Sequence, residues 1–146
     1  MPNKYTFQIK PIKNLLERHT EGIGADPFAD KNIIAKVSNK IAESHICALE
    51  FLKNLESNYF DWVVYDPPYS ITQARKYGHK KFSSMKYWAD VKNEIKRVIK
   101  TGGKAICCGW SSMGIGKTRG FEMIEILLVP HGGSKNDTIV TVEIKK

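Results

Sequence analysis

Near the middle of the chain, residues 61–69 read Asp61-Trp62-Val63-Val64-Tyr65-Asp66-Pro67-Pro68-Tyr69. A continuous apolar run of this length between charged residues is typical of a strand that is buried on both faces, as in a parallel sheet. The two prolines fix the backbone and supply no N–H donor, so the strand cannot continue through them. The segment therefore predicts an interior strand that ends sharply at Asp66.

Helix and strand patterns alternate on both sides of this run. Apolar residues at helical spacing predict helices over residues 11–21, 47–55 and 88–100. Apolar and β-branched runs predict strands over residues 23–28, 104–108, 121–129 and 137–144, the last two joined by a long hairpin loop. Residues 33–38 fit a strand, but their spacing also fits a helix. This order predicts an α/β three-layer sandwich, a mostly parallel sheet that ends in an antiparallel hairpin.

Size and composition restrict the class of protein. The chain has 146 residues, of which 42% are apolar and 26% charged, so we expect one domain over residues 1–146. No run approaches the roughly 20 apolar residues of a membrane span, and residues 1–10 do not resemble a secretory signal. The three cysteines (Cys47, Cys107 and Cys108) and four histidines lack metal-site spacing. We therefore expect no disulfide and no bound metal, and a cytoplasmic location.

The positive charge is concentrated in one part of the chain. The net charge is +8, and residues 71–100 carry nine Lys or Arg against two acidic residues. Such a basic block predicts contacts with a polyanion, and the alternative is a solvated helix face. The candidate nucleic-acid-binding residues stand among aromatic residues that could stack on bases, and they are Arg75, Lys76, Lys80, Lys81 and Lys86.

The turn after the central strand carries the candidate catalytic residues, Asp66, Pro67, Pro68 and Tyr69. Ligands of open α/β sheets bind beyond the carboxyl ends of the strands, where this turn is expected. The Asp66 carboxylate and the Pro67 carbonyl can each accept one N–H, and Tyr69 can stack on a ring. This set of groups suits a planar substrate that bears an amino group.

Asp66-Pro67-Pro68-Tyr69 resembles the catalytic motif of S-adenosylmethionine-dependent amino methyltransferases, in the form used by adenine-specific DNA methyltransferases. Lys10-Pro11-Ile12-Lys13 resembles the N-terminal motif of that family, which packs beside the methionine part of the cofactor. Asp26-Pro27-Phe28-Ala29 resembles its first cofactor motif. The small, phage-type adenine DNA methylases are the most similar group. The resemblance implies an abbreviated Rossmann-like methyltransferase sandwich that binds S-adenosylmethionine, with cofactor-binding residues Lys10, Pro11, Asp26, Pro27, Phe28, Asn39 and Asp66.

The same resemblance implies an enzyme that transfers a methyl group from S-adenosylmethionine to the exocyclic amino group of adenine in DNA. One alternative is an RNA base amino methyltransferase, with RNA ranked below DNA as partner. The other is a non-catalytic nucleic-acid-binding module that keeps the fold and has lost the cofactor. Because residues 1–146 leave no room for a separate target-recognition domain, we expect loops, a partner or a second copy in a homodimer to select the target.

The chain departs from the cofactor motif after Phe28. No glycine follows it, although backbone N–H groups approach a ligand most closely where glycine is present. Only four residues separate Phe28 from Ile33, whereas a parallel crossover needs about a dozen or more. Either the helix after the first strand is absent, or residues 30–42 form that helix and the second strand is missing.

Overall fold

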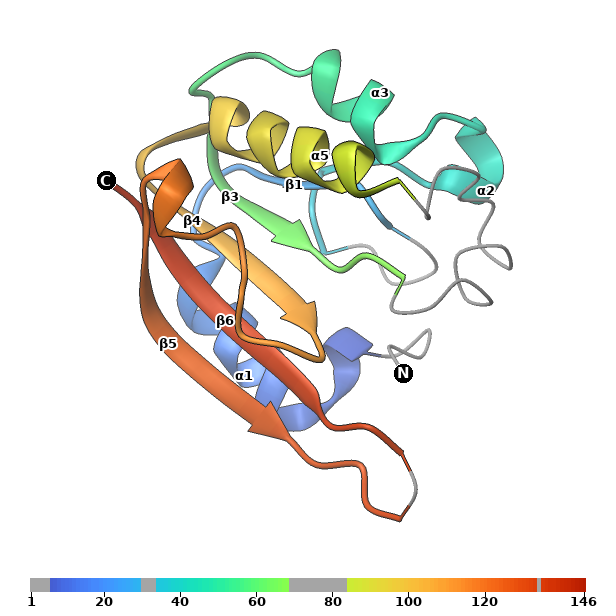
Figure 1. Cartoon of the computed structure of the whole chain (residues 1–146), viewed down its shortest axis with the longest axis vertical. Coiled ribbons are helices and arrows are strands. Elements are labelled where there is room, and N and C mark those ends of the chain that lie inside the picture. Colours follow the sequence, from blue (N-terminus) through green and yellow to red (C-terminus); the bar gives the residue numbers. More distant parts are fainter. Residues whose placement is uncertain (1–5, 30–33, 69–83, 134) are drawn as a thin grey trace.

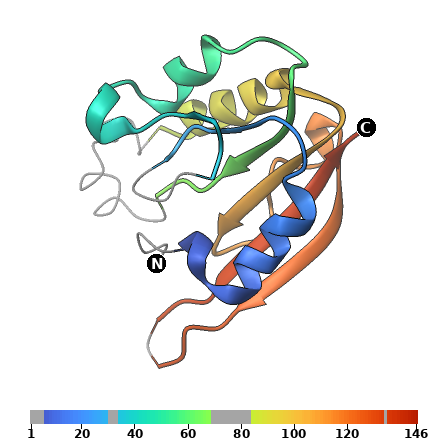
Figure 2. The same cartoon turned by 180° about the vertical axis from the view of Figure 1, so that it is seen from behind.

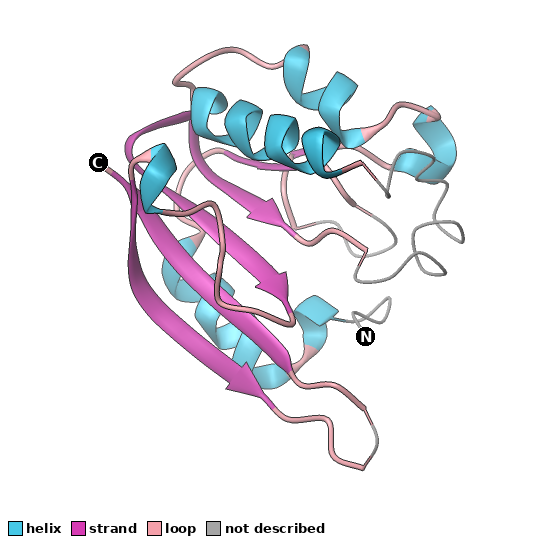
Figure 3. Ribbon diagram, in the orientation of Figure 1, coloured by secondary structure: helices cyan, strands magenta, loops and turns pink. Residues whose placement is uncertain are grey.

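In the computed structural model, six strands form one sheet in the order β2-β1-β3-β4-β6-β5 (Figures 1 and 3). The structure describes residues 6–29, 34–68, 84–133 and 135–146, and this count of strands refers to those residues. Strands β2, β1, β3 and β4 are parallel, and β6 and β5 are antiparallel to their neighbours. The strands are β1 (Gly24–Asp26), β2 (Val37–Ser38), β3 (Phe60–Tyr65), β4 (Ile99–Gly109), β5 (Phe121–Val129) and β6 (Thr138–Lys145). The predicted α/β sandwich with a C-terminal antiparallel hairpin is confirmed.

Helices cover both faces of this sheet. The helical segments among the described residues are η1 (Thr6–Gln8), α1 (Lys10–His19), α2 (Ile41–Ser44), α3 (Ala48–Lys53), α5 (Met85–Val98) and η2 (Lys117–Arg119). Figure 2 shows α1 across one face of β4 and β6, whereas α5 and α3 lie on the other face (Figure 1). The three predicted helices are therefore present, with ends shifted by one to three residues.

The third predicted helix ends earlier than its sequence pattern indicates. The hydroxyl of Ser84 accepts the backbone N–H of Tyr87 at 3.2 Å, and this cap starts α5 at residue 85. At the other end, the chain leaves the helix at Ile99, which already pairs with Phe60 of β3. The expectation that the helix continues to residue 100 was wrong because this pairing recruits residues 99–103 into β4.

The central strand separates two apolar cores. Val63 and Tyr65 belong to the core on the α5 face, and Trp62 and Val64 to the core on the α1 face. All four side chains are buried. The interior strand expected from residues 62–65 is thus confirmed. Successive side chains of a strand point to opposite faces, so a continuous apolar run satisfies both cores at once.

The connection between β1 and β2 settles the alternatives for residues 30–42. Ala25 pairs with Val37 and Asp26 with Ser38, so a second parallel strand exists. The described residues between the two strands, 27–29 and 34–36, include no helix. The alternative in which residues 30–42 form a helix and the second strand is missing was wrong. The short α2 follows β2.

The first strand lies unusually close to the central one. Gly24 of β1 pairs with Trp62 of β3, and a Cβ atom at Gly24 would lie 2.0 Å from the indole ring. Only glycine permits this approach, which lets Trp62 fold across β1.

In the part of the chain that the structure describes, no helix is long and apolar enough to cross a membrane.

Candidate functional site

The carboxyl ends of three parallel strands meet at one edge of the sheet. β1 ends at Asp26, β3 at Tyr65 and β4 at Gly109, and the register places β3 between the other two (Figure 1). The structure therefore brings Asp26-Pro27-Phe28 and Asp66-Pro67-Pro68 to the same edge. Ligands of open α/β sheets bind at this edge, which makes it the candidate active site.

Asp26 is the most unusual carboxyl group at this edge. Its side chain is 1% exposed, and Oδ1 accepts the backbone N–H of Phe28 at 2.9 Å. Its second oxygen, Oδ2, is buried and has no hydrogen-bond partner within the described residues. Burial raises the pKa of Asp26 from 3.8 to about 7, although the hydrogen bond from Phe28 opposes this. A buried acceptor without a donor is costly, so Asp26 suits a ligand that brings a donor.

Phe28 connects Asp26 to the core on the α5 face. Its ring meets Tyr65 edge to face at 5.7 Å between centroids and stacks on Trp88 at 5.9 Å. The preceding residue of the motif, Pro27, is buried. The predicted cofactor motif therefore packs firmly against β3 and α5, and this packing fixes the position of the turn that follows β1.

Asn39 follows β2 and holds the neighbouring turns together. Its side-chain Nδ2 donates to the backbone oxygens of Pro27 at 3.3 Å and Ile46 at 2.9 Å. Its Oδ1 accepts the hydroxyl of Ser44 at 2.7 Å. Because both N–H groups are used within the chain, Asn39 could meet a ligand only as an acceptor, through the remaining lone pair of Oδ1.

The N-terminal motif lies at the start of α1. Lys10 and Pro11 are exposed, and Pro11 occupies the first turn, where its missing N–H removes no helical bond. Figures 1 and 2 both show that η1 and the start of α1 lie near the carboxyl end of β4. The motif thus reaches the same end of the sheet as the two aspartates, on the α1 face.

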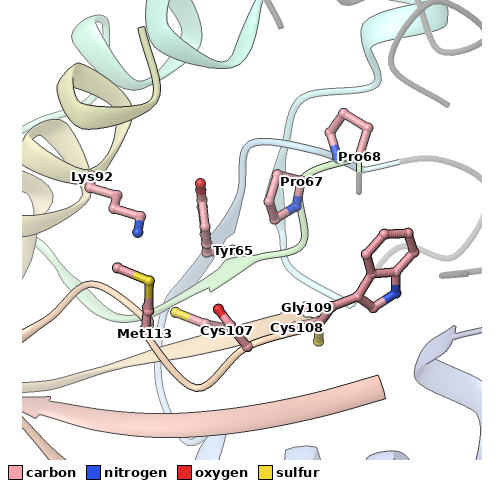
Figure 4. Close-up of a pocket in the computed structure, with 11 residues that line it drawn as sticks. Tyr65, Pro67, Pro68, Lys92, Cys107, Cys108, Gly109 and Met113 are labelled. Carbon is pink, nitrogen blue, oxygen red and sulfur yellow. The ribbon is translucent and has the colours of Figure 1, made fainter. Parts of the chain in front are cut away.

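The turn after β3 forms part of a cavity of about 300 Å³. Asp66 and Pro67 are half-buried and Pro68 is buried, and the two prolines line the cavity (Figure 4). The opposite wall is the end of β4 with the loop after it, from Cys107 to Gly114. The proline-rich turn therefore presents its fixed backbone to a space in which a small ligand fits.

Three cavity residues escaped the sequence analysis, namely Lys92, Trp110 and Met113. Trp110 and Met113 are exposed, by 45% and 75%, and follow the carboxyl end of β4. The strand-end argument applied to Asp66 would have found them. Lys92 carried no such signal, since a lysine within an amphipathic helix is ordinarily a solvated residue.

The carboxylate of Glu143 binds the backbone of the loop after β4. Glu143 of β6 is 2% exposed and accepts the backbone N–H groups of Ile115 at 2.7 Å and Gly116 at 2.9 Å. Gly114 has a φ of +53°, and a Cβ there would lie 2.2 Å from Glu143 Oε2. The N–H groups of Ile115 and Gly116 therefore bind the chain's own carboxylate and are not available to a phosphate.

Cys107 and Cys108 lie beneath the site on β4 and are both buried. Burial raises the pKa of each thiol above its usual range, and the Glu143 carboxylate adds to this at Cys107. The carboxylates of Asp66 and Asp26 act in the same direction on Cys108. The thiols therefore stay protonated and act as core side chains.

Several predicted residues fall outside the described chain. Tyr69, Arg75, Lys76, Lys80 and Lys81 lie within residues 69–83, which the structure does not describe. Lys86 is described, in the first turn of α5, where its exposed ammonium pairs with Asp90 at 2.6 Å. No group of three His, Cys, Asp or Glu residues that could hold a metal ion occurs among the described residues.

Comparisons with known proteins show the fold of the chain. No protein-family model matches the sequence, and no curated protein sequence matches it significantly. The N-methyltransferase NodS from Bradyrhizobium japonicum WM9 has a similar structure, with a TM-score of 0.57, 12% identity and coverage of 97% of this chain and 98% of NodS. The structure of SMU.1697c from Streptococcus mutans, described as a methyltransferase candidate in complex with SAH, matches at a TM-score of 0.50 with 10% identity over 90% of this chain and 93% of that protein.

A third similar structure is longer than this chain. TrmN from Thermus thermophilus matches at a TM-score of 0.47 with 14% identity, over 75% of this chain. This chain spans 28% of the length of TrmN. The chain has the Rossmann-like fold of the full-length matches, a mostly parallel sheet with an antiparallel C-terminal pair.

Proposed function

We propose that this chain is an S-adenosylmethionine-dependent methyltransferase that acts on the exocyclic amino group of a nucleobase, with adenine in DNA as the preferred substrate. The observation that carries the proposal is the pair of strand ends at one edge of the sheet. Asp26, whose buried Oδ2 has no hydrogen-bond partner within the part of the chain that the structure describes, ends β1, and Asp66-Pro67-Pro68 follows the adjacent β3. The shared fold with NodS supports this assignment.

The residues at the end of β1 suit the cofactor. S-adenosylmethionine carries an ammonium group and hydroxyl groups, which are the donors that Asp26 Oδ2 lacks. Asp26 and Pro27 with Phe28 would hold it from the turn after β1, Asn39 through its amide oxygen, and Lys10-Pro11 from the start of α1. When bound, the cofactor supplies an activated methyl group on a sulfonium sulfur.

Asp66 and Pro67 would orient the amine that receives the methyl group. The lone pair of an aromatic amine is delocalised into its ring, and the amine is therefore a poor nucleophile. Two acceptors, the Asp66 carboxylate and the Pro67 carbonyl, can draw both amino hydrogens to one side and leave the lone pair facing away from them. The rigid diproline backbone holds these acceptors at a fixed separation, and Tyr69 would stack on the base.

The substrate requires access to this edge. A base within a duplex must flip out to reach Asp66, which costs a few kcal/mol. The cavity of about 300 Å³ beside Pro67 can take a planar ring, and the exposed Trp110 at its rim offers a stacking surface. Cations that follow Tyr69 along the chain would bind phosphates on either side of the base, namely Arg75, Lys76, Lys80, Lys81 and Lys86. The three free cysteines agree with a reducing cytoplasm.

One observation favours a second candidate, the non-catalytic nucleic-acid-binding module. The connection between β1 and β2 is short, and its described residues include no helix. The described residues of this connection therefore do not provide the backbone N–H groups of a helix start, and no glycine follows Phe28 within residues 29–36. Such a module would bind nucleic acid through the basic residues without binding S-adenosylmethionine.

Isothermal titration with S-adenosylmethionine separates the two candidates. The enzyme binds it, and the module does not bind it at millimolar concentration. Transfer of a labelled methyl group to DNA and, in parallel, to RNA then identifies the nucleic acid. Asp66→Ala should abolish transfer without loss of the fold, whereas Glu122→Ala, an exposed carboxylate paired with Lys146 on the edge strand β5, should not. Near-normal methyl transfer by Asp66→Ala would contradict the proposal that Asp66 orients the substrate amine.

A further inference from the structure

One side chain that lines the cavity, Lys92, carries a positive charge whose role the Asp66-Pro67-Pro68 motif does not explain. Lys92 lies on α5, and Figure 4 shows its ammonium turned into the cavity toward Tyr65 and Met113. Its Nζ lies 5.7 Å from the centroid of the Tyr65 ring. Among the described residues, the contact of this ammonium is with the Tyr65 ring, and no carboxylate or carbonyl oxygen forms an ion pair or hydrogen bond with it. The three N–H donors of Lys92 thus point into a space where a ligand can be placed.

The charged groups around Lys92 have partners of their own. Glu143 uses its oxygens on the loop after β4. Arg119 donates to the side chain of Asn93 at 2.8 Å and to backbone oxygens. Burial lowers the pKa of Lys92, and the Arg119 charge acts in the same direction, while Cys107 and Glu143 oppose it. The Tyr65 ring attracts this half-buried ammonium, but within the described residues no hydrogen-bond acceptor replaces the hydration that the ammonium loses.

The lining of the cavity favours a neutral acceptor over a phosphate. Around the ammonium lie the Tyr65 ring, the Cys107 thiol and the Met113 thioether, and Pro67 lies farther along the wall. A phosphate drawn into this space would lose its hydration to one cation and several apolar groups, which is costly. A heteroaromatic base is neutral, and its ring faces suit the same groups.

We propose that Lys92 donates a hydrogen bond to an acceptor atom on the substrate base, a ring nitrogen or a carbonyl oxygen, and so positions the base beside Asp66-Pro67. The inference rests on the proposed function, since it names the group of the substrate that this end of the cavity recognises. Pro67 and Lys92 both line the cavity, and Asp66 directly precedes Pro67, so a base in the cavity would lie between groups of opposite polarity. Acceptors at Asp66-Pro67 bind the amino hydrogens, and the donor at Lys92 binds a lone pair on the same ring. Lys92 is a positioning residue that selects bases with both features.

Nuclear magnetic resonance of the whole chain tests this without catalysis. Lysine side chains carry ¹³C at Cε, the Lys92 signal is identified with Lys92→Met, and adenosine, cytidine, guanosine and inorganic phosphate are added separately. We expect the Lys92 signal to shift with at least one nucleoside and not with phosphate. Lys96, exposed one turn along the same helix, serves as the control and should not shift. A shift with phosphate, or none with any nucleoside, overturns the proposal.

Kinetics of the same variants give a second, separate readout. Lys92→Met should raise KM for the unmethylated oligonucleotide substrate by about 10-fold to 100-fold, the range for a hydrogen bond to a charged group, with kcat changed by less than about threefold. Lys92→Arg should recover part of this loss, and Lys96→Met should match the parent chain. A fall in kcat at unchanged KM, with an unaltered circular dichroism spectrum, contradicts the positioning role. A chain that binds no S-adenosylmethionine yet shows the nucleoside-dependent shift contradicts only the proposed function.

Discussion

Asp26→Asn should change how the stability of the chain depends on pH. Asp26 is buried, and among the described residues only its Oδ1 has a hydrogen-bond partner, the N–H of Phe28. Asparagine keeps an oxygen for this bond and replaces the other oxygen with a neutral amide nitrogen of similar size. The substitution therefore removes a buried ionisable group while preserving the turn after β1.

The size of the effect follows from the raised pKa. Asp26 ionises near 3.8 in an unfolded chain and near about 7 in the fold. Between these values the folded state binds more protons than the unfolded state, so the free energy of unfolding falls as pH rises through this window. Each pKa unit is worth about 1.4 kcal/mol, so the loss amounts to about 4 kcal/mol above pH 7. Below pH 3.8 this loss is absent.

Urea denaturation of both proteins between pH 4 and pH 8 measures this effect. Other carboxyl groups titrate equally in the two chains, so the difference between the curves isolates Asp26. We expect Asp26→Asn to gain stability relative to the parent chain by about 4 kcal/mol across this range. As a control, Glu122→Gln should shift the difference in the opposite direction, because a hydrogen bond from Lys146 lowers the pKa of this exposed group.

The same variant links stability to the proposed cofactor. If a donor of S-adenosylmethionine binds Asp26 Oδ2, Asp26→Asn should weaken cofactor binding although it stabilises the fold above pH 7. A parent chain whose stability relative to Asp26→Asn stays constant from pH 4 to pH 8 would refute the reasoning, since Asp26 would then ionise alike in both states.

Three further predictions concern the loop, the basic residues and the assembly. Glu143→Gln should cost about 1–3 kcal/mol in urea denaturation, because an amide nitrogen cannot accept the second of the two N–H groups that Glu143 now binds, and unchanged stability would contradict this. Each phosphate contact contributes about −0.9 to the log–log slope of DNA affinity against salt, so replacing four basic residues with Gln should flatten the slope by roughly three to four. The four residues are Arg75, Lys76, Lys80 and Lys81. An unchanged slope would show that they do not contact phosphates and only form a solvated surface. Light scattering should give twice the mass of 16.6 kDa if the chain is the expected homodimer, and a monomer with and without DNA would exclude it.

The elements that the sequence predicted best are those with strong local patterns. The run at residues 62–65 indicated an interior strand because every position is apolar, and the structure buries all four side chains between two cores. The helix ends were less predictable. Residues 99–103 carry no strong strand pattern, and they join β4 because β3 offers backbone partners there.

The candidate site divides in the same way. Asp66-Pro67-Pro68 was found from the sequence, since a proline-rich turn after a buried strand must lie at the carboxyl edge of a parallel sheet. Lys92 is 26 residues farther along the chain and has no local signal. Its place in the cavity depends on how α5 packs over β3 and β4, which is a property of the whole fold.

The sequence by itself determined the strand at residues 62–65, the proline turn after it and the acceptor groups at that turn. Apolar periodicity and proline act over only a few residues, so both can be read without the fold. The sequence also carried the basic block at residues 71–100, since charge is read directly from composition. Three features depend on tertiary packing alone. Among the described residues Asp26 keeps one oxygen without a donor, Glu143 accepts the N–H of Ile115 in the loop after β4, and Lys92 faces the Tyr65 ring. Burial, partner atoms and distances between remote residues are set only once the chain is folded, and these quantities single out the residues of the candidate site.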